Sequence, residues 1–246
     1  MSRGPDRAAG QADVLILCGG RGERLKAAVP DRPKPMAEID GMPFLDHLIS
    51  YVGSFGFRRF VLCAGFMAGY IESYYGGRKN QNYEIIVSAE EKPLGTGGAL
   101  KNAETLVNSR DFIAMNGDSL LRFDPRALLA FHRAKNADAT VVLSAVRKSE
   151  DFGTVRIGES GLVTAFSEKA ENGRGPVNAG VYAMRKAVLA GIAAGRNISL
   201  EKEVFPSMAG KALYGYECGA EFIDIGTPER FGSAPDKIRK IKNGLL

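Results

Sequence analysis

Three glycines directly follow a short apolar run near the start of the chain, and this is the first place where the residues could bind a ligand. The run is Val14 to Leu17, and the segment after it contains Gly19, Gly20 and Gly22. Glycines allow a tight turn and let the backbone approach a ligand closely. Backbone N–H groups in a loop at the carboxyl end of a strand can bind phosphate. Taken alone the loop is weakly diagnostic, because it lacks the third glycine of a dinucleotide fingerprint and the chain has no G-x-x-x-x-G-K-[ST] motif.

A lysine held between two prolines follows this turn, in the segment Pro33-Lys34-Pro35-Met36. Proline fixes its own φ and pushes the residue before it toward extended geometry. We therefore expect the Lys34 ammonium to be aimed at one point. An isolated Pro-Lys-Pro is more often a solvated loop whose prolines stop a helix. Its position after a glycine turn that also contains Arg24 favours a role in binding a phosphate.

Two aspartates border or interrupt apolar runs. Asp118 follows the run 112–115, and Asp224 lies inside the run 222–225. A carboxylate among apolar residues is costly unless it is paired or bound to a metal. Mg²⁺ prefers oxygen ligands and usually takes one or two carboxylates together with substrate phosphates. Taken singly, such an aspartate more often caps a turn than binds a metal.

The elements that must position these residues alternate between apolar runs and helical patterns. We expect strands at 14–18, 60–64, 83–88, 112–115 and 140–146, and helices at 44–55, 67–75, shortly after 97 and at 125–135. This alternation predicts an α/β fold with a Rossmann-like, mostly parallel sheet covered by helices. Beyond residue 151, shorter strands at 153–157, 162–166, 177–184 and 214–225 predict a β-rich extension. A last helix is expected to begin at Pro228 with Thr227 as its N-cap.

The overall composition indicates one globular domain. The chain has 246 residues, of which 45% are hydrophobic and 25% charged. We expect a mobile tail over 1–11 and a single domain over 12–246, whose two halves meet near residue 150, because no linker or repeat separates them. The net charge of +5 is a modest excess that fits small anionic substrates better than nucleic acid. The terminal basic run 237–242 is interleaved with isoleucines and is typical of one solvated helix face.

The cysteine content and the hydropathy of the chain indicate in which cellular compartment the protein works. The three cysteines are an odd number inside apolar runs, so neither a disulfide framework nor a zinc cluster is indicated. No stretch reaches the 18 or so apolar residues of a membrane helix. We therefore expect a cytoplasmic protein without a membrane or nucleic-acid partner, and the sequence leaves open whether it forms a homo-oligomer.

Taken together, these motifs resemble the sugar nucleotidyltransferases, which join a nucleoside triphosphate to a sugar 1-phosphate and release pyrophosphate. Gly19-Gly20-x-Gly22-x-Arg24-Leu25 followed by Pro33-Lys34-Pro35-Met36 is similar to the N-terminal signature of that family. The resemblance covers nearly the whole chain. It implies that residues 12–150 form the nucleotide-binding half and residues 151–246 the sugar-phosphate half.

The resemblance also implies roles for individual residues. It implies contacts from Arg24 to the outgoing pyrophosphate, from Lys34 to the triphosphate and from Lys169 to the sugar 1-phosphate; with Asp118 these are the expected catalytic residues. It implies Mg²⁺ as the cofactor, held by Asp118 and Asp224. The implied nucleotide-binding residues are Leu17, Cys18, Gly19, Gly20, Gly22, Arg24, Lys34, Glu90, Gly95, Thr96, Gly97 and Asp118. The implied sugar-phosphate-binding residues are Gly153, Glu168, Lys169, Asn178 and Glu201.

Glu90 suggests which base is bound. It lies just before the second glycine-rich turn, 94–100, and an ionised carboxylate suits the two N–H donors on the Watson–Crick edge of guanine. A solvated loop acid is at least as common an explanation for such a residue. The segments 17–20, 93–98, 151–155 and 199–201 look most like D-glycero-α-D-manno-heptose 1-phosphate guanylyltransferases, whose product is GDP-heptose.

Several alternatives remain open. These are a uridylyltransferase for amino-sugar or muramic-type 1-phosphates, a mannose-1-phosphate guanylyltransferase, a non-catalytic nucleotide-sugar sensor and a nucleic-acid module. A phosphate oxygen is ionised at neutral pH, so the reaction needs no general base. We accordingly expect His47 and His132 to lie on helix surfaces rather than to act as catalysts, and Cys18 to be a small apolar residue.

Overall fold

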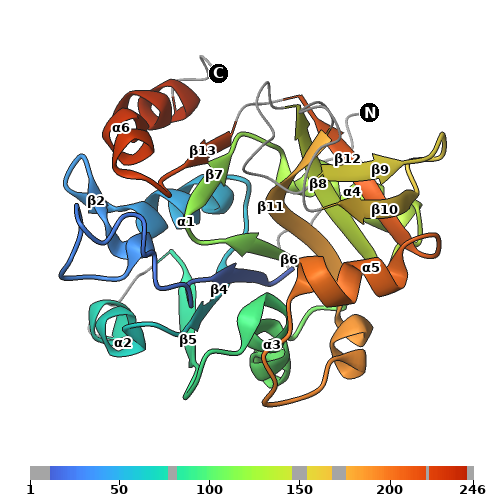
Figure 1. The fold of residues 1–246 in the computed structure, drawn as a ribbon, viewed down its shortest axis with the longest axis horizontal. Coiled ribbons are helices and arrows are strands. Elements are labelled where there is room, and N and C mark those ends of the chain that lie inside the picture. Colours follow the sequence, from blue (N-terminus) through green and yellow to red (C-terminus); the bar gives the residue numbers. More distant parts are fainter. Residues whose placement is uncertain (1–11, 77–81, 146–153, 168–175, 220–221, 243–246) are drawn as a thin grey trace.

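A nine-stranded sheet forms the centre of the computed structural model, which describes residues 12–76, 82–145, 154–167, 176–219 and 222–242 (Figure 1). The expected tail, 1–11, lies outside the described residues, as do Gly153, Glu168 and Lys169 of the expected site. Among the described residues, no helix combines the length and the apolar character needed to cross a membrane.

Four parallel strands make up the first half of the sheet. They are β1 (Val14–Leu17), β4 (Arg59–Ala64), β5 (Glu84–Ala89) and β6 (Asp111–Asn116), in the spatial order β5-β4-β1-β6. In the register of the sheet Leu17 pairs with Cys63 on one side and with Asn116 on the other. The loops that follow β1, β4 and β6 therefore leave the sheet side by side at one edge. This is the ligand-binding edge predicted from the sequence.

Antiparallel pairing extends the sheet in the second half. The strands are β8 (Ala139–Ala145), β9 (Thr154–Ile157), β10 (Val163–Ser167), β11 (Pro176–Arg185) and β12 (Leu213–Cys218). β11 runs antiparallel to both β6 and β8, whereas β12 is parallel to β8. In Figure 1 the sheet passes from β5 at the left to β9 and β10 at the right. The predicted α/β fold with a parallel core and a β-rich second half is confirmed.

The prediction of one strand over 214–225 was wrong. This segment forms β12 in the main sheet and then β13 (Phe222–Asp224), which pairs with β7 (Ser119–Leu121) in a separate two-stranded sheet. Ile223 is buried opposite Leu120 in the small sheet. The residues expected to form one strand are therefore divided between two sheets. A further short hairpin, β2 (Glu38–Ile39) with β3 (Met42–Pro43), precedes the first helix.

Helices pack against the sheets, and the last of them packs against the two-stranded sheet of β7 and β13. They are α1 (Phe44–Ser54), α2 (Ala68–Gly76), α3 (Gly95–Asn102), α4 (Pro125–Ala134), α5 (Phe205–Met208) and α6 (Pro228–Lys242). Alternate residues of β1 point to opposite faces, so Ile16 belongs to one apolar cluster and Leu15 to another. As predicted, α6 begins at Pro228, and the Thr227 hydroxyl accepts a hydrogen bond from the Arg230 N–H at 3.3 Å.

Both histidines are buried, contrary to the prediction that they lie on helix surfaces. His47 is 2% exposed and His132 is 1% exposed. The His47 Nε2 lies 3.0 Å from the Ile39 carbonyl oxygen, and the His132 Nδ1 lies 2.9 Å from the Thr140 hydroxyl. Burial lowers the pKa of His132 to about 4. The buried face of each helix is wider than its apolar residues alone indicate. Each imidazole can be buried because it has a polar partner in the interior.

Candidate active site

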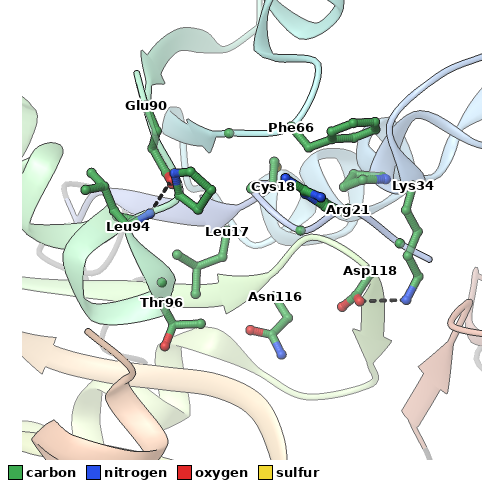
Figure 2. A pocket seen from close by; sticks show the side chains of 18 of the residues that line it. Leu17, Cys18, Arg21, Lys34, Phe66, Glu90, Leu94, Thr96, Asn116 and Asp118 are labelled. Atoms are coloured by element: carbon green, nitrogen blue, oxygen red, sulfur yellow. Dashed lines mark hydrogen bonds and ion pairs between the residues drawn. The ribbon is translucent and has the colours of Figure 1, made fainter. Parts of the chain in front are cut away.

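A cleft of about 800 Å³ opens at the carboxyl ends of β1, β4 and β6 (Figure 2). The glycine turn after β1 forms one wall, and the start of α3 forms another. All of the predicted nucleotide-binding residues line this cleft except Gly97, whose N–H donates to the Ile198 carbonyl at 2.8 Å. Gly97 therefore packs α3 against the 198 segment instead of facing the cleft.

Lys34 reaches the cleft over the glycine turn. Gly22 has a φ of +61°, and a Cβ on it would lie 2.9 Å from the Lys34 Cβ. The missing side chain therefore lets the lysine stem cross the loop. Lys34 itself begins a 3₁₀ turn, Lys34–Met36, and Pro33 is extended with ψ 146°. The ammonium is held in place as the two prolines predict, with 10% of the side chain exposed.

Asp118 and Asp224 both lie at the Lys34 ammonium. The Lys34 Nζ is 2.7 Å from the Asp118 Oδ2 and 3.7 Å from the Asp224 Oδ1 (Figure 2 shows the Asp118 contact). The pairing of β13 with β7 sets Asp224 opposite Ser119, and the Ile225 N–H donates to the Asp118 carbonyl at 3.1 Å. Two acids far apart in the sequence are thus neighbours.

The two acids differ in exposure and in their other partners. The Asp224 side chain is 15% exposed; it accepts hydrogen bonds from the Arg230 guanidinium at 2.9 Å and from the Gly226 N–H. The Asp118 side chain is 40% exposed and lines the cleft. The Lys34 ammonium thus lies between the two carboxylates.

The donor set fits a metal that also binds substrate. Among the residues described by the structure, no group of three or more histidine, cysteine or acidic side chains is placed to enclose a metal ion. Two carboxylates leave most coordination positions of Mg²⁺ for water and phosphate oxygens, which is how Mg²⁺ usually binds at phosphate-transfer sites. The residues at this position therefore suit a divalent ion that arrives with a polyphosphate.

Glu90 borders the cleft near α3. Its Oε2 accepts a hydrogen bond from the Leu94 N–H at 3.0 Å, shown in Figure 2. Burial raises the pKa of Glu90, and the Leu94 N–H partly offsets this effect. One carboxylate oxygen is thus occupied in shaping the turn before α3. A contact from Glu90 to a base remains a prediction.

The two predicted sugar-binding residues that the structure describes, Asn178 and Glu201, are not among the residues that line this cleft. Both instead bond to Tyr182, which is fully buried. Arg24, in contrast, lines the cleft and is exposed there. The structure thus brings the nucleotide set and the acid pair together, and it sets the two described members of the sugar set behind the cleft wall.

Some cleft residues were missed in the sequence. Asn116 ends β6 and Phe66 follows β4, so the rule that ligands bind at the carboxyl ends of strands could have identified both. Arg21 belongs to the glycine turn and could have been identified in the same way. Asn197 comes from a distant segment, and its amide donates to the Pro93 carbonyl at 3.2 Å. No local signal marks that residue.

Cys18 lines the cleft, but its thiol is unreactive. It is 1% exposed, and burial raises its pKa well above the ordinary value. Its Sγ lies 3.5 Å from the Ile16 carbonyl oxygen. A thiol that stays protonated is a poor nucleophile. This confirms the prediction that Cys18 acts as a small apolar residue.

Comparison with known proteins identifies relatives over nearly the whole chain. Residues 13–241 match the family described as Nucleotidyl transferase. The chain is 37% identical over 237 residues to the mannose-1-phosphate guanylyltransferase of Mycobacterium tuberculosis, covering 94% of this chain and 66% of that protein. It is 35% identical over 228 residues to the D-glycero-α-D-manno-heptose 1-phosphate guanylyltransferase of Aneurinibacillus thermoaerophilus, covering 92% of this chain and 98% of that protein. It thus spans nearly all of the heptose enzyme but just under two thirds of the mannose enzyme.

Solved structures share the fold. HddC from Yersinia pseudotuberculosis superposes with a TM-score of 0.81 at 32% identity, covering 92% of this chain and 99% of that chain. The HddC structure in complex with GMP-PN gives the same values. The inositol-1-phosphate CTP transferase from T. maritima has a TM-score of 0.77 at 23% identity, which shows the common fold alone.

Proposed function

The chain belongs to the nucleotidyl transferase family, and on that premise we propose that it joins GTP to D-glycero-α-D-manno-heptose 1-phosphate. An oxygen of the sugar phosphate attacks the α-phosphorus of GTP, the bond from that phosphorus to the β-phosphate oxygen breaks, and GDP-heptose and pyrophosphate are released. The observation that carries the proposal is the meeting of Lys34, Asp118 and Asp224 at the wall of a glycine-lined cleft.

Repulsion between two anionic substrates is the main obstacle to this reaction, and fixed cations reduce it. Lys34 projects into the cleft with its stem fixed over Gly22, which holds its ammonium, paired with Asp118, at the wall where phosphate oxygens would bind. Arg24, exposed at the cleft, balances the charge that grows on the leaving pyrophosphate. Lys169 is assigned the sugar phosphate by resemblance. The attacking oxygen is already ionised, so no residue has to remove a proton.

Asp118 and Asp224 would hold a divalent ion, which we assign as Mg²⁺. A divalent ion held by these two carboxylates would supply positive charge to offset that of the phosphates. Arg230 and the Gly226 N–H fix the Asp224 carboxylate, while Asp118, paired with Lys34, is more exposed and lines the cleft. Asp224 is thus rigidly placed and Asp118 is exposed, and this arrangement suits a metal site that is completed when the substrate binds.

The choice of base and sugar rests on the relatives. The two relatives named above are both guanylyltransferases by name, which favours GTP, and the heptose enzyme matches over nearly its full length. Glu90 is assigned to guanine. The second candidate sugar is mannose 1-phosphate, which the 37% identity to the Mycobacterium tuberculosis enzyme favours. We assign residues 12–150 to the nucleotide and residues 151–246 to the sugar phosphate within one domain. The free cysteines favour a cytoplasmic reaction.

Pyrophosphate release measured across a matrix of substrates tests this function. Each of GTP, ATP, UTP and CTP is combined with heptose 1-phosphate, mannose 1-phosphate and N-acetylglucosamine 1-phosphate in the presence of Mg²⁺. We expect the highest kcat/KM for GTP with heptose 1-phosphate. A preference for UTP would contradict the guanine assignment, and a preference for mannose 1-phosphate would establish the second candidate. Binding of nucleotide sugar without any pyrophosphate release would indicate a sensor instead of an enzyme.

A further inference from the structure

A chain of hydrogen bonds runs behind the cleft, from the start of α3 to the middle of β11. The Thr96 hydroxyl donates to the Glu201 Oε2 at 2.8 Å, and the Tyr182 hydroxyl donates to the Glu201 Oε1 at 2.9 Å. The Asn178 amide in turn donates to the Tyr182 hydroxyl oxygen at 2.9 Å. We refer to these four residues as the Glu201 bridge.

Glu201 is anchored at the centre of this bridge. It lies in a π-helical turn, Leu200–Val204, and its Oε2 also accepts a hydrogen bond from the Ser199 hydroxyl at 2.9 Å. The Leu200 N–H donates back to the Thr96 hydroxyl oxygen at 2.8 Å. Both carboxylate oxygens therefore bind protein hydroxyls. This leaves Glu201 poorly placed as the ligand for sugar hydroxyls that the resemblance implies.

Each end of the bridge accepts a hydrogen bond from the backbone of a segment beside the cleft. Thr96 lines the cleft, yet its hydroxyl points away from it toward the bridge (Figure 2). At the other end the Asn178 Oδ1 accepts a hydrogen bond from the Gly180 N–H at 2.9 Å, within a shift of register in β11. Gly180 has a φ of +69° and packs against the side chain of Asn116, a cleft residue.

We propose that Glu201 and Tyr182 are positioning residues, which join the nucleotide loop at the start of α3 to strand β11 and touch neither substrate. The inference rests on the proposed function for the identity of the substrates. It follows that the affinity for the nucleotide depends on the Tyr182 hydroxyl, although Tyr182 is fully buried and does not line the cleft. Burial, with Glu201 nearby, raises the Tyr182 pKa, so this hydroxyl remains a donor at neutral pH.

The test measures binding of GTP with Mg²⁺ by calorimetry, without sugar phosphate, for Tyr182→Phe, Glu201→Gln and the double variant. We expect each single change to weaken binding by roughly three- to tenfold, the factor that corresponds to an ordinary hydrogen bond. The double variant should be no weaker than the weaker single variant, because both changes break one linkage. The KM for the nucleotide should rise more than kcat falls.

Tyr51→Phe is the matched control. The Tyr51 hydroxyl also makes two hydrogen bonds, to the carbonyl and N–H of Phe123 at 2.8 Å each, and Tyr51 does not line the cleft. GTP affinity should be unchanged in this variant even if its melting temperature falls as far as that of Tyr182→Phe. Equal affinities for Tyr182→Phe and Tyr51→Phe would overturn the inference, as would a Glu201→Gln variant that raises the KM for sugar phosphate alone.

The control experiment separates this inference from the proposed function. If the unchanged protein binds UTP in place of GTP, the proposed base is wrong, and the same comparison is made with UTP. If the unchanged protein binds GTP tightly and Tyr182→Phe binds it equally well, the proposed base stands and the positioning role is wrong.

Discussion

Gly180→Ala should damage catalysis far more than it damages the fold. Gly180 has a φ of +69°, a conformation that costs an alanine about 1–2 kcal/mol. A Cβ built there lies 2.5 Å from the Asn116 Nδ2, whereas ordinary contact begins near 3.4 Å, so the side-chain amide of Asn116 must move by roughly 0.9 Å. Asn116 ends β6 and lies two residues before Asp118. A displacement of about 1 Å at a reacting centre can lower the rate about 10²-fold.

Gly210→Ala separates the two effects of this change. Gly210 has a φ of +74°, and a Cβ there meets nothing within 4 Å, so the backbone penalty is similar and no neighbour has to move. Urea denaturation should show both variants losing about 1–2 kcal/mol of unfolding free energy. Pyrophosphate release should show a roughly 10²-fold lower kcat only for Gly180→Ala. If the two variants turn over at similar rates, Asn116 does not help to position the Asp118 loop.

Three further predictions concern the site and its surroundings. Asp118→Ala should lower kcat about 10²- to 10³-fold in saturating substrate, and near-normal turnover would refute its role. The pKa of His132 is about 4 in the folded protein against an ordinary 6.5, so the folded state binds the proton less well than the unfolded state does. The free energy of unfolding should therefore be highest above pH 6.5 and fall by up to about 3 kcal/mol as the pH is lowered toward 4. Urea denaturation should show a weaker pH dependence in this range for His132→Gln, and an unchanged slope would exclude His132 as its source. A thiol reagent at pH 8 should label Cys218 before Cys18 and Cys63, whose pKa values are raised by burial; mass spectrometry of the labelled peptides checks the order, and early labelling of Cys18 would contradict it.

Local motifs were sufficient to predict many of the residues that line the cleft. The glycine turn and Asn116-Gly117-Asp118 each follow an apolar strand, and parallel strands deliver their following loops to one edge. The structure places both motifs in the same cleft, as this rule requires. The conformation of Lys34 was predictable for a different reason, because two prolines and a glycine restrict the backbone around it.

Long-range pairing was not predictable from such patterns. The position of Asp224 depends on β13 leaving the main sheet to pair with β7, and an alternating apolar run does not specify which sheet accepts it. The buried histidines were misjudged because amphipathic patterns count only apolar residues. Glu201 was assigned to the sugar by resemblance, and two of the three hydroxyls that occupy its carboxylate, those of Thr96 and Tyr182, come from other elements of the fold.

The contacts of Lys34 explain how a nearly buried cation can exist at a site built for anions. A lysine with 10% of its side chain exposed needs a partner, since an unpaired buried charge costs several kcal/mol. Asp118 and Asp224 supply that partner in the protein alone. The same two carboxylates are the ones that suit a divalent ion, and phosphate oxygens can replace them at the ammonium. If phosphate oxygens bind as proposed, the charges of the site stay paired both without and with substrate, and one cluster serves both the stability of the fold and the binding of polyanions.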